Sequence, residues 1–456
     1  MRTIKQLDVD VNEFSINFEK TDDDVLYLDS GSKLSVLNIS KLIKDKHPNF
    51  YRGAIVYSEN TFRNNIRKTS EILAKHFDKF RISWAVKSIS LEYMVKVAAK
   101  EGIGFDVGSY EELELAKKAN VAMNFIYHTA PAKYDWDINA IANKECVSIS
   151  DNITELTLIN DAAKVTGNKI KVGIRVNPVI ESNTDSAIAT GNINCKFGIP
   201  SVSPEFFIEL KKLKNIEVSI LQMHIGSQIS SMSNYENAIL SMVKTYKMFI
   251  SNGFNIETID IGGGFPYKYY PSDELNSTDS EHAWSNNVNY DFEKLISKIS
   301  KLFKKEIKGV LPCIAIEPGR HLTAGTAFAV GYVLNTKIYP NNIQWVMTSL
   351  SVNDFWHKQI VPNTYYDINV LTGKKETQML PSAVAGTLCF SNDILTPPCL
   401  AIDLPKGIQR NDVVFIKNVG AYSALGTGNF HNMPTLPIYI IDNDLKLVEI
   451  KKPKTV

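Results

Sequence analysis

Short apolar runs recur along the middle of the chain, and stretches with a different apolar spacing separate them. The runs lie at 81–87, 104–107, 125–128, 147–151, 172–177, 220–224, 259–262 and 314–317. Between most of them apolar residues recur every three to four positions, as in 110–119 and 236–249, which is typical of amphipathic helices. This alternation predicts βα units around a parallel sheet. Eight such units within about 250 residues predict a closed (β/α)8 barrel.

Nearly every run closes with a polar side chain. These closing residues are Lys87, Asp106, His128, Asp151, Arg175, Asn177, His224, Asp260 and Glu317. In a barrel the carboxyl ends of all the strands meet on one face, where barrel enzymes place their active sites. Strands that merely end in polar loops would explain one or two of these positions, but they explain poorly a lysine, a histidine, a triple glycine and a glutamate together. We therefore expect a site on this face.

The pattern changes on both sides of the predicted barrel. After residue 320, strand-like runs such as 328–333 and 413–416 lie between turn-forming Pro, Gly, Asn and Asp residues, which predicts a second, mostly β domain. The first 50 residues are mixed, with one expected strand at 25–28. The predicted organisation is an N-terminal segment, 1–50, that belongs to the β domain, a barrel at 51–320, and a C-terminal β domain at 321–456.

One long connection also stands out. The stretch 267–289 follows a predicted barrel strand and is polar with scattered aromatic residues. A loop of this length in a compact domain is usually functional or disordered, so a substrate lid and a disordered loop both remain open.

Composition narrows the class of protein. The 456 residues include 50 Lys and Arg and 49 Asp and Glu, a formal net charge of +1, and 44% are hydrophobic. These values are typical of a folded globular protein and argue against a nucleic-acid binder, which normally carries a strong basic excess. No apolar run approaches the ~18 residues that a membrane span needs, and the first residues turn polar too early for a signal peptide.

The cysteines indicate the compartment. There are five, an odd number, and they are widely spaced with no CxxC pair. Neither a disulfide framework nor a zinc site is indicated, and we expect no metal. A reducing cytoplasm is the simplest location.

Two features of the predicted face suggest that it binds a phosphate and an aldehyde. Gly262, Gly263 and Gly264 directly follow a strand, and backbone without side chains can approach a phosphate with its N–H groups, although glycines also make plain turns. Lys87 ends an apolar strand, where a desolvated amine can form a Schiff base. The alternative for Lys87 is an ordinary lysine that extends to solvent.

Two further residues complete one pattern. Glu317, in Glu-Pro-Gly-Arg, could pair with a protonated ring nitrogen or with a nearby cation, and His224 could stack on a ring or be a satisfied polar residue. Pyridoxal 5′-phosphate (PLP) needs a lysine for its aldehyde, a partner for its pyridine nitrogen, a phosphate cradle and a flat group over its ring. Lys87, Glu317, the glycines and His224 together match these needs.

With these residues in place, the sequence resembles the fold-type III PLP-dependent decarboxylases, the group of diaminopimelate, ornithine and arginine decarboxylases. The resemblance runs from about Arg52 to Pro434. Its ordered motifs are AVKS at 85–88, GFDVGSYEEL at 104–113, TGNINCKFGI at 190–199, HIGSQI at 224–229, DIGGGF at 260–265, EPGR at 317–320, a segment from Cys389 to Asp393, and GAY at 420–422. Each motif is weak alone, but the ordered set is specific.

The resemblance implies a role for each matching residue. Lys87 would hold PLP as a Schiff base, His224 would stack on the ring and Glu317 would pair with the pyridine nitrogen. Asp106 would lie beside Lys87, with Arg175 supporting that region. The phosphate would be surrounded by Ser227, Gly262, Gly263, Gly264, Arg320 and Tyr422. Cys389 would enter the site of the neighbouring subunit and donate a proton, so the resemblance also implies a homodimer. The implied reaction is loss of the α-carboxylate of an amino acid.

Two departures from the family pattern bear on the substrate. The residue after the catalytic cysteine is usually acidic and holds the distal amine, but here it is Phe390, and an unpaired ammonium in a pocket would be costly. Asp354 is followed by Phe-Trp and then His357 and Lys358, without the arginine that diaminopimelate enzymes carry for the distal carboxylate.

A diamino acid whose distal nitrogen is already an amide would fit, such as N-citryl-ornithine in carboxylate-siderophore biosynthesis. His357, Lys358, Lys268 and His282 are then candidate donors to the citryl carboxylates, and Asp354 and Phe390 are expected to line the substrate.

Three alternatives stay open at this level. The substrate could be free diaminopimelate, ornithine or lysine. The chain could be a relative that lacks PLP and regulates a partner, although Lys87, Glu317 and Cys389 argue against this. An amino-acid racemase would use the same barrel, but racemases of that type leave the ring nitrogen unprotonated beside an arginine, whereas Glu317 favours decarboxylation.

Overall fold

The computed structural model describes most of the chain, and its contacts divide these residues into two units. The described residues are 2–4, 13–21, 24–29, 31–48, 52–180, 184, 186–200, 202–269, 291–361, 364–373, 378–397, 400–423 and 430–453. One unit comprises 66–266 and 289–321, and the other comprises 1–65, 267–288 and 322–456. The predicted lid at 267–289 therefore falls almost wholly outside the described residues.

The first unit is the predicted barrel, and this fold prediction is confirmed. Its strands close in the order β10-β11-β12-β13-β6-β7-β8-β9, and every pairing is parallel. They are β6 (Phe80–Ala85), β7 (Gly104–Val107), β8 (Ile126–His128), β9 (Val147–Ser150), β10 (Ile170–Arg175), β11 (Ile216–Gln222), β12 (Thr258–Asp260) and β13 (Cys313–Ile316). Each lies within a few residues of an expected run. Because all eight are parallel, their carboxyl ends share one face.

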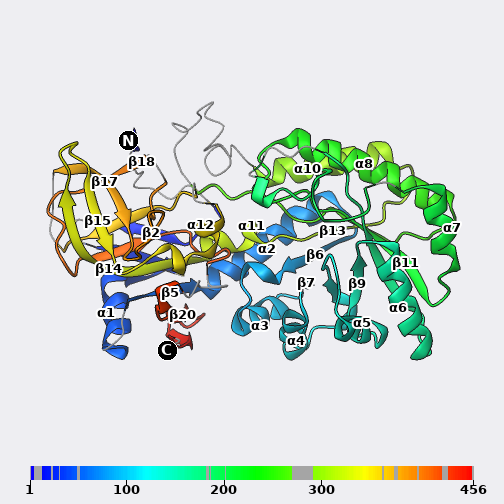
Figure 1. The fold of residues 1–456 in the computed structure, drawn as a ribbon, viewed down its shortest axis with the longest axis horizontal. Helices are drawn as coiled ribbons and strands as arrows, with labels where there is room; N and C mark the ends of the chain where they lie inside the picture. Colours follow the sequence, from blue (N-terminus) through cyan, green and yellow to red (C-terminus); the bar gives the residue numbers. More distant parts are fainter. Residues whose placement is uncertain are drawn as a thin grey trace. The chain divides into compact units, whose positions relative to one another are not determined.

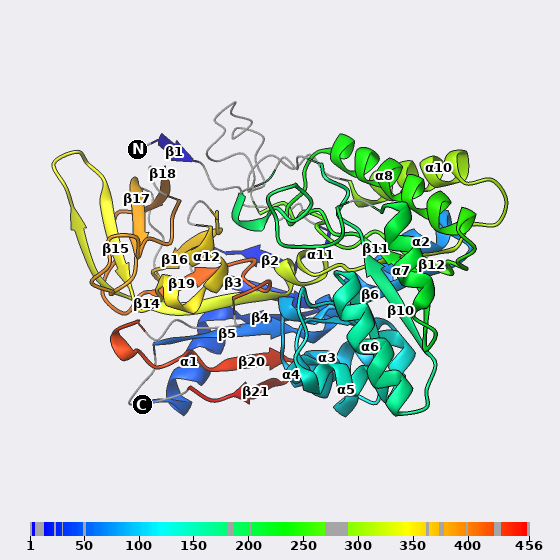
Figure 2. The ribbon, with the colours of Figure 1, turned by 45° about the vertical axis from the view of Figure 1, so that its right-hand side comes forward.

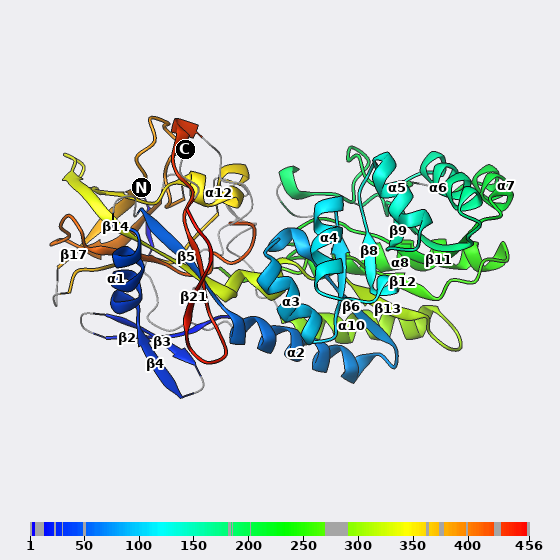
Figure 3. The same ribbon diagram turned by 90° about the horizontal axis from the view of Figure 1, so that it is seen from below.

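Helices lie outside the ring of strands (Figure 1). They are α2 (Glu59–His76), α3 (Glu92–Lys100), α4 (Tyr110–Lys118), α5 (Asp135–Ala142), α6 (Ile153–Val165), α7 (Pro204–Lys212), α8 (Met232–Ser251) and α10 (Phe292–Glu306). Figure 3 shows α4 beside β8, which it contacts. Side chains cap several helices: Ser109, Asn152 and Asp291 accept from backbone N–H groups three residues on, at the starts of α4, α6 and α10.

The second unit is mostly β, as predicted. Its strands are β1 (Arg2–Ile4), β2 (Asn17–Lys20), β3 (Val25–Asp29), β4 (Ser32–Ser35), β5 (Gly53–Ser58), β14 (Ala327–Ile338), β15 (Gln344–Thr348), β16 (Ile368–Leu371), β17 (Met379–Ala385), β18 (Leu400–Pro405), β19 (Val413–Ile416), β20 (Ile438–Ile441) and β21 (Leu447–Lys451). Strands β2 to β4 form a small antiparallel sheet, and the others form a ten-stranded sheet. Helix α1 (Val36–Lys46), the 3-10 helix η6 (Val352–Asp354) and helix α12 (Trp356–Ile360) complete the unit.

The boundary between the units differs from the expected one at residue 51. Strand β5 pairs antiparallel with β14 and parallel with β20, as Figure 2 shows, so it belongs to the β unit. All six of its residues are buried. The contact boundary falls at residue 65, within α2.

Candidate active site

Lys87 and Asp106 lie next to each other at the carboxyl ends of neighbouring strands. Lys87 is in the 3-10 turn η1 (Val86–Ser88), which directly follows β6, and Asp106 is in β7. The Lys87 Nζ lies 3.5 Å from Asp106 Oδ2. The lysine side chain is 47% exposed although both of its chain neighbours are buried, so its amine reaches the open face of the barrel. The carboxylate is buried and stabilises the lysine cation.

The triple glycine packs against two other strand ends. A Cβ on Gly262 would overlap the Met223 carbonyl oxygen, and one on Gly263 would overlap the Glu317 carbonyl oxygen. Gly262 and Gly264 also have φ of +69° and +86°, a region that side chains disfavour. The loop is pinned further because the Glu317 N–H donates to the Gly262 carbonyl at 2.8 Å. Only glycines allow this close approach of three loops.

Glu317 is a buried acid that lies near the ends of strands β11 and β12. It follows β13 and is 4% exposed. The Gln222 Nε2 at the end of β11 donates to both of its oxygens, at 3.2 and 3.0 Å. Asp260, at the end of β12, is fully buried and its Oδ1 accepts from the Gly262 N–H at 2.8 Å. Gln222 and Asp260 therefore belong to the site, although our sequence analysis gave neither a role.

The electrostatics of this cluster favour a cation near Glu317. Burial raises the pKa of Glu317 well above its usual range, the Asp106 and Asp260 carboxylates raise it further, and Lys87 and Arg175 oppose the shift. Burial also raises the pKa of Asp260 to about 7. A positively charged group against Glu317 would return its carboxyl to the ionised form.

A histidine and an arginine face the same region. The His224 Nδ1 accepts from the Gly263 N–H at 3.4 Å, and desolvation lowers the pKa of His224 well below its usual value. Its ring is therefore neutral at pH 7, as a group that stacks on another ring can be. Arg320 begins the short helix α11 (Arg320–Thr323), and its Nε and Nη2 both lie 3.2 Å from Ser227 Oγ. The Arg320 guanidinium is thus held near the glycine loop, where an anion would be bound.

Not every polar strand end contributes to this cluster. The His128 Nε2 lies 3.1 Å from Asp137 Oδ1 of α5, because alternate residues of a strand face opposite sides and Tyr127 takes the inner side. Asp151 accepts from the Gly198 N–H at 2.7 Å and holds the loop after β10. Arg175 lies close enough to the site to lower the pKa of both Glu317 and His224. Its guanidinium stacks 4.4 Å from the Phe197 ring centroid, and its Nη2 is buried without a hydrogen-bond partner among the described residues.

The remaining family-implied residues belong to the β unit. Tyr422 has a φ of +59°, an uncommon conformation for a tyrosine, and its ring stacks on His357 at 6.0 Å. Cys389 is an exposed free thiol, and the following Phe390 is 47% exposed. Asp393 shapes this loop by accepting from the Leu388 N–H and the Val352 N–H, each at 2.8 Å.

The expected substrate donors are mostly engaged inside the β unit. Asp354 is fully buried and forms a bidentate ion pair with Arg52, with one contact of 2.6 Å. The Lys358 Nζ is buried and donates to the Thr364 carbonyl at 2.7 Å, and burial lowers its pKa to about 7. His357 is also buried, with its Nδ1 3.2 Å from Thr364 Oγ1.

The other two expected donors are Lys268 and His282. Lys268 is half-buried, and His282 lies outside the described residues. The assignment of all these residues to a substrate stays a prediction.

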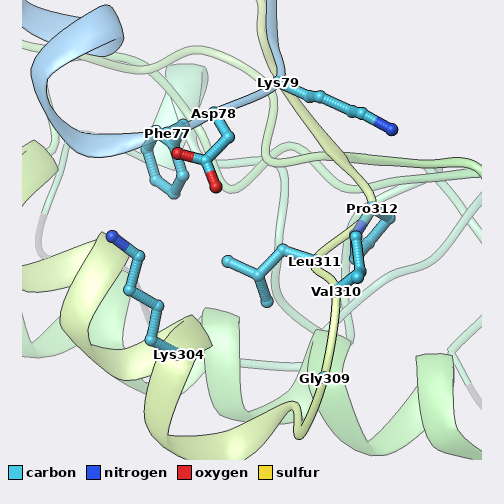
Figure 4. Close-up of a pocket in the computed structure, with 8 residues that line it drawn as sticks. All are labelled: Phe77, Asp78, Lys79, Lys304, Gly309, Val310, Leu311 and Pro312. Atoms are coloured by element: carbon cyan, nitrogen blue, oxygen red, sulfur yellow. The ribbon is translucent and has the colours of Figure 1, made fainter.

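Three further observations concern the described residues as a whole. Within the residues that the structure describes, no group of His, Cys, Asp and Glu could hold a metal ion, and no helix is long and apolar enough to cross a membrane. A cavity of about 320 Å³ opens between 77–79, Lys304 and 309–312 (Figure 4). These segments directly precede β6 and β13, so the cavity lies at the amino ends of the strands, opposite the candidate site.

The residues present fit PLP. An exposed lysine amine, a buried acid whose pKa calls for a cationic partner, a neutral histidine and a glycine loop beside an arginine occur at the ends of β6, β13, β11 and β12. Bound PLP would supply an electron sink for carbanion chemistry. Fold and site together define a PLP-dependent decarboxylase of fold-type III.

Comparison with known proteins identifies the family. Residues 63–324 match the family model described as "Pyridoxal-dependent decarboxylase, pyridoxal binding domain", which is more than half of the chain. The chain belongs to the pyridoxal-dependent decarboxylase family, and it is a PLP-dependent carboxy-lyase of the diamino-acid type. The cofactor predicted from the sequence is confirmed at this level, and the alternative of a relative without PLP is not.

Similar proteins cover nearly the whole chain. A diaminopimelate decarboxylase of Aquifex aeolicus is 27% identical over 410 residues, 89% of this chain and 90% of that protein. One of Staphylococcus aureus is also 27% identical, over 88% of this chain and 91% of that protein. Among solved structures, the diaminopimelate decarboxylase of Methanocaldococcus jannaschii has a TM-score of 0.81 at 24% identity, covering 96% of this chain and 95% of that one. The structural likeness supports the fold.

Proposed function

We propose that this enzyme removes the α-carboxylate of a diamino acid whose distal nitrogen is already an amide, such as N-citryl-ornithine, in carboxylate-siderophore biosynthesis. The observation that carries the proposal is the side chain beside Cys389. Phe390 packs against Phe430 with ring centroids 6.0 Å apart, and both are about half exposed, at 47% and 50%. His431 stacks on Phe430 at 4.5 Å. The surface next to the thiol is thus aromatic rather than acidic.

This aromatic surface offers no carboxylate to a free distal ammonium. A charged amine enclosed against it in a pocket would lose hydration without gaining a carboxylate partner, which costs several kcal/mol. An amide nitrogen carries no charge and can lie on an aromatic ring at little cost. The substrate class follows from this difference.

The aromatic surface is held in a fixed place. Asn353 of η6 donates to the Phe430 carbonyl at 3.0 Å, and Val352 of the same helix donates to Asp393 of the cysteine loop at 2.8 Å. The buried pair between Asp354 and Arg52 anchors η6 itself. One short helix therefore sets the positions of both Phe390 and Phe430, as a specificity surface requires.

The barrel residues supply the chemistry common to the family. Lys87 would bind the cofactor aldehyde through its amine, and Asp106 keeps that amine oriented at 3.5 Å. Glu317 would pair with the ring nitrogen and keep it protonated, while His224 would cover one ring face. When bound, PLP would supply an electron sink for the bond to the α-carbon that breaks as CO₂ leaves. Cys389 would then return a proton to this carbon.

The proton donor adds a second part to the proposal. We place Cys389 in the site of a neighbouring copy, so that the active enzyme is a homodimer. Mixing inactive Lys87→Ala and Cys389→Ala proteins should restore up to about a quarter of the activity if two copies share each site. Activity that never rises above that of the separate variants would contradict this arrangement.

A second candidate substrate is diaminopimelate. The names of similar proteins favour it, since several are diaminopimelate decarboxylases of near-equal length. In the α12 region, however, the residues after Asp354 include His357 and Lys358 and no arginine.

CO₂ release from N-citryl-ornithine, diaminopimelate, ornithine, lysine and arginine, measured side by side, separates the candidates. We expect the acylated substrate to have the highest kcat/KM. In Phe390→Glu the preference should move toward free diamino acids, whereas Trp136→Glu, in an exposed aromatic pair on α5, serves as the control. A clear wild-type preference for a free diamino acid would rule out the acylated substrate.

A further inference from the structure

Gln222, at the end of β11, faces Glu317, which follows β13 two strands along the barrel. Its side chain is fully buried at the end of β11, and its Nε2 donates to both oxygens of Glu317, at 3.2 and 3.0 Å. In the barrel register Gln222 is the direct partner of Asp260 on β12. Two strands thus present an amide and a carboxyl side by side to the same acid.

We propose that Gln222 is a positioning residue that holds the Glu317 carboxylate in the orientation, and in the ionised form, that the ring nitrogen of the cofactor requires. The inference depends on the cofactor and is independent of the proposed substrate. An amide can donate to a carboxylate but cannot itself ionise, so Gln222 adds no charge to a site that already holds three acids. Its two contacts also restrict rotation of the carboxylate.

The orientation of the amide supports this role. Its N–H side faces Glu317, and its Oε1 is buried with no hydrogen-bond partner among the described residues. An ionised carboxylate can only accept hydrogen bonds, so the N–H side of the amide is the side that the ionised form of Glu317 requires. A buried oxygen without a partner is costly. The Gln222 amide therefore leaves its oxygen without a hydrogen bond among the described residues, while its nitrogen donates to both oxygens of Glu317.

The charged groups around Glu317 make such a donor necessary. Asp260 on β12 and Asp106 on β7 both raise the pKa of Glu317, in addition to burial, while Lys87 after β6 and Arg175 on β10 lower it. A hydrogen bond to the charged form of an acid favours that form. Loss of the Gln222 amide removes such a bond, so the Glu317 carboxyl will keep its proton to a higher pH.

The test replaces the amide by a group of similar shape. Gln222→Met removes both donor contacts with little change of volume, and Gln222→His returns an N–H donor. Gln344→Met is the matched control, since Gln344 is equally buried, donates to Ser382 and the Pro405 carbonyl, and belongs to the β unit. Each holoenzyme is titrated for PLP dissociation and for its visible absorption between pH 5 and 9, and its melting temperature is recorded.

The expected results separate positioning from a purely structural role. In Gln222→Met we expect PLP affinity about tenfold weaker at pH 7, as for loss of a hydrogen bond to a charged group. The acid-side midpoint of affinity and absorption should move up by about one pH unit. Gln222→His should restore the wild-type midpoint, and Gln344→Met should change only the melting temperature. An unchanged midpoint in Gln222→Met, or an equal shift in Gln344→Met, would overturn the proposal.

Discussion

The glycine loop gives the sharpest prediction about the cofactor site. A Cβ on Gly263 would lie 3.2 Å from the Glu317 carbonyl carbon and would overlap its oxygen. These contacts are with backbone rather than with a flexible side chain, so either the loop or the Glu317 backbone must move, by about 1 Å. Overpacking of this kind costs about 1–3 kcal/mol, and a displacement of that size near the chemistry can cost about 100-fold in rate.

We therefore expect Gly263→Ala to fold, to bind PLP more weakly and to lose about 100-fold in kcat/KM. PLP affinity is measured by absorbance titration, and CO₂ release gives the rate. Gly108→Ala is the control, because a Cβ there would lie 3.8 Å from Glu112 Oε2, an ordinary contact, and Gly108 also follows a barrel strand. Wild-type affinity and rate in Gly263→Ala would refute the reasoning, because the loop would then have room that the structure denies.

Three further predictions follow from other contacts. Lys87→Arg should show no pyridoxyl adduct after borohydride treatment, as peptide mass spectrometry would detect; an adduct at another lysine would displace Lys87 from its role. The pKa of Asp260 is raised to about 7, so in the apoprotein this carboxyl stabilises the fold most below pH 4 and loses that contribution as pH rises to about 7. Asp260→Asn should therefore reduce the fall of the melting temperature over this pH range. An unchanged fall would contradict the shift. Arg52→Met leaves its aspartate partner buried and should cost about 3–5 kcal/mol, whereas Lys75→Met breaks a pair with Glu293 in which the two side chains are 58% and 47% exposed and should cost less than about 1 kcal/mol; equal melting temperatures would count against the distinction.

The barrel could be predicted because each strand carries its signal locally. Strands such as β7 and β10 are short apolar runs between amphipathic helices, and their expected positions agree with the structure to within a few residues. Strand β5 carries the same local signal, six buried residues, but its partners are β14 and β20. The local pattern of apolar residues does not indicate pairing with strands so far along the chain, so β5 could not be distinguished from a barrel strand by sequence.

The site was predictable where residue type and position together imply chemistry. Lys87, Asp106, His224 and Glu317 gather as expected, because parallel strands bring their carboxyl ends together. Gln222 could not be predicted, because a glutamine inside an apolar strand indicates no chemistry until its hydrogen-bond partner is known.

His128 shows the opposite error. It closes an expected run as His224 does, but it faces α5 and Asp137. The residue type is the same as that of His224, and only the direction of the side chain distinguishes the two.

The pairing of β5 also has a consequence for how the protein is made. Ile55 lies opposite Ile438 in the sheet, so a ribosome must add almost all of the remaining chain before this contact can form. At about 5–20 residues per second, the interval is about 20 to 80 s. During that time an apolar strand made early in synthesis has an unpaired edge, which is a template for aggregation. We expect the yield of soluble protein to depend on chaperones that cover this strand, and expression without the last strands to give insoluble chains.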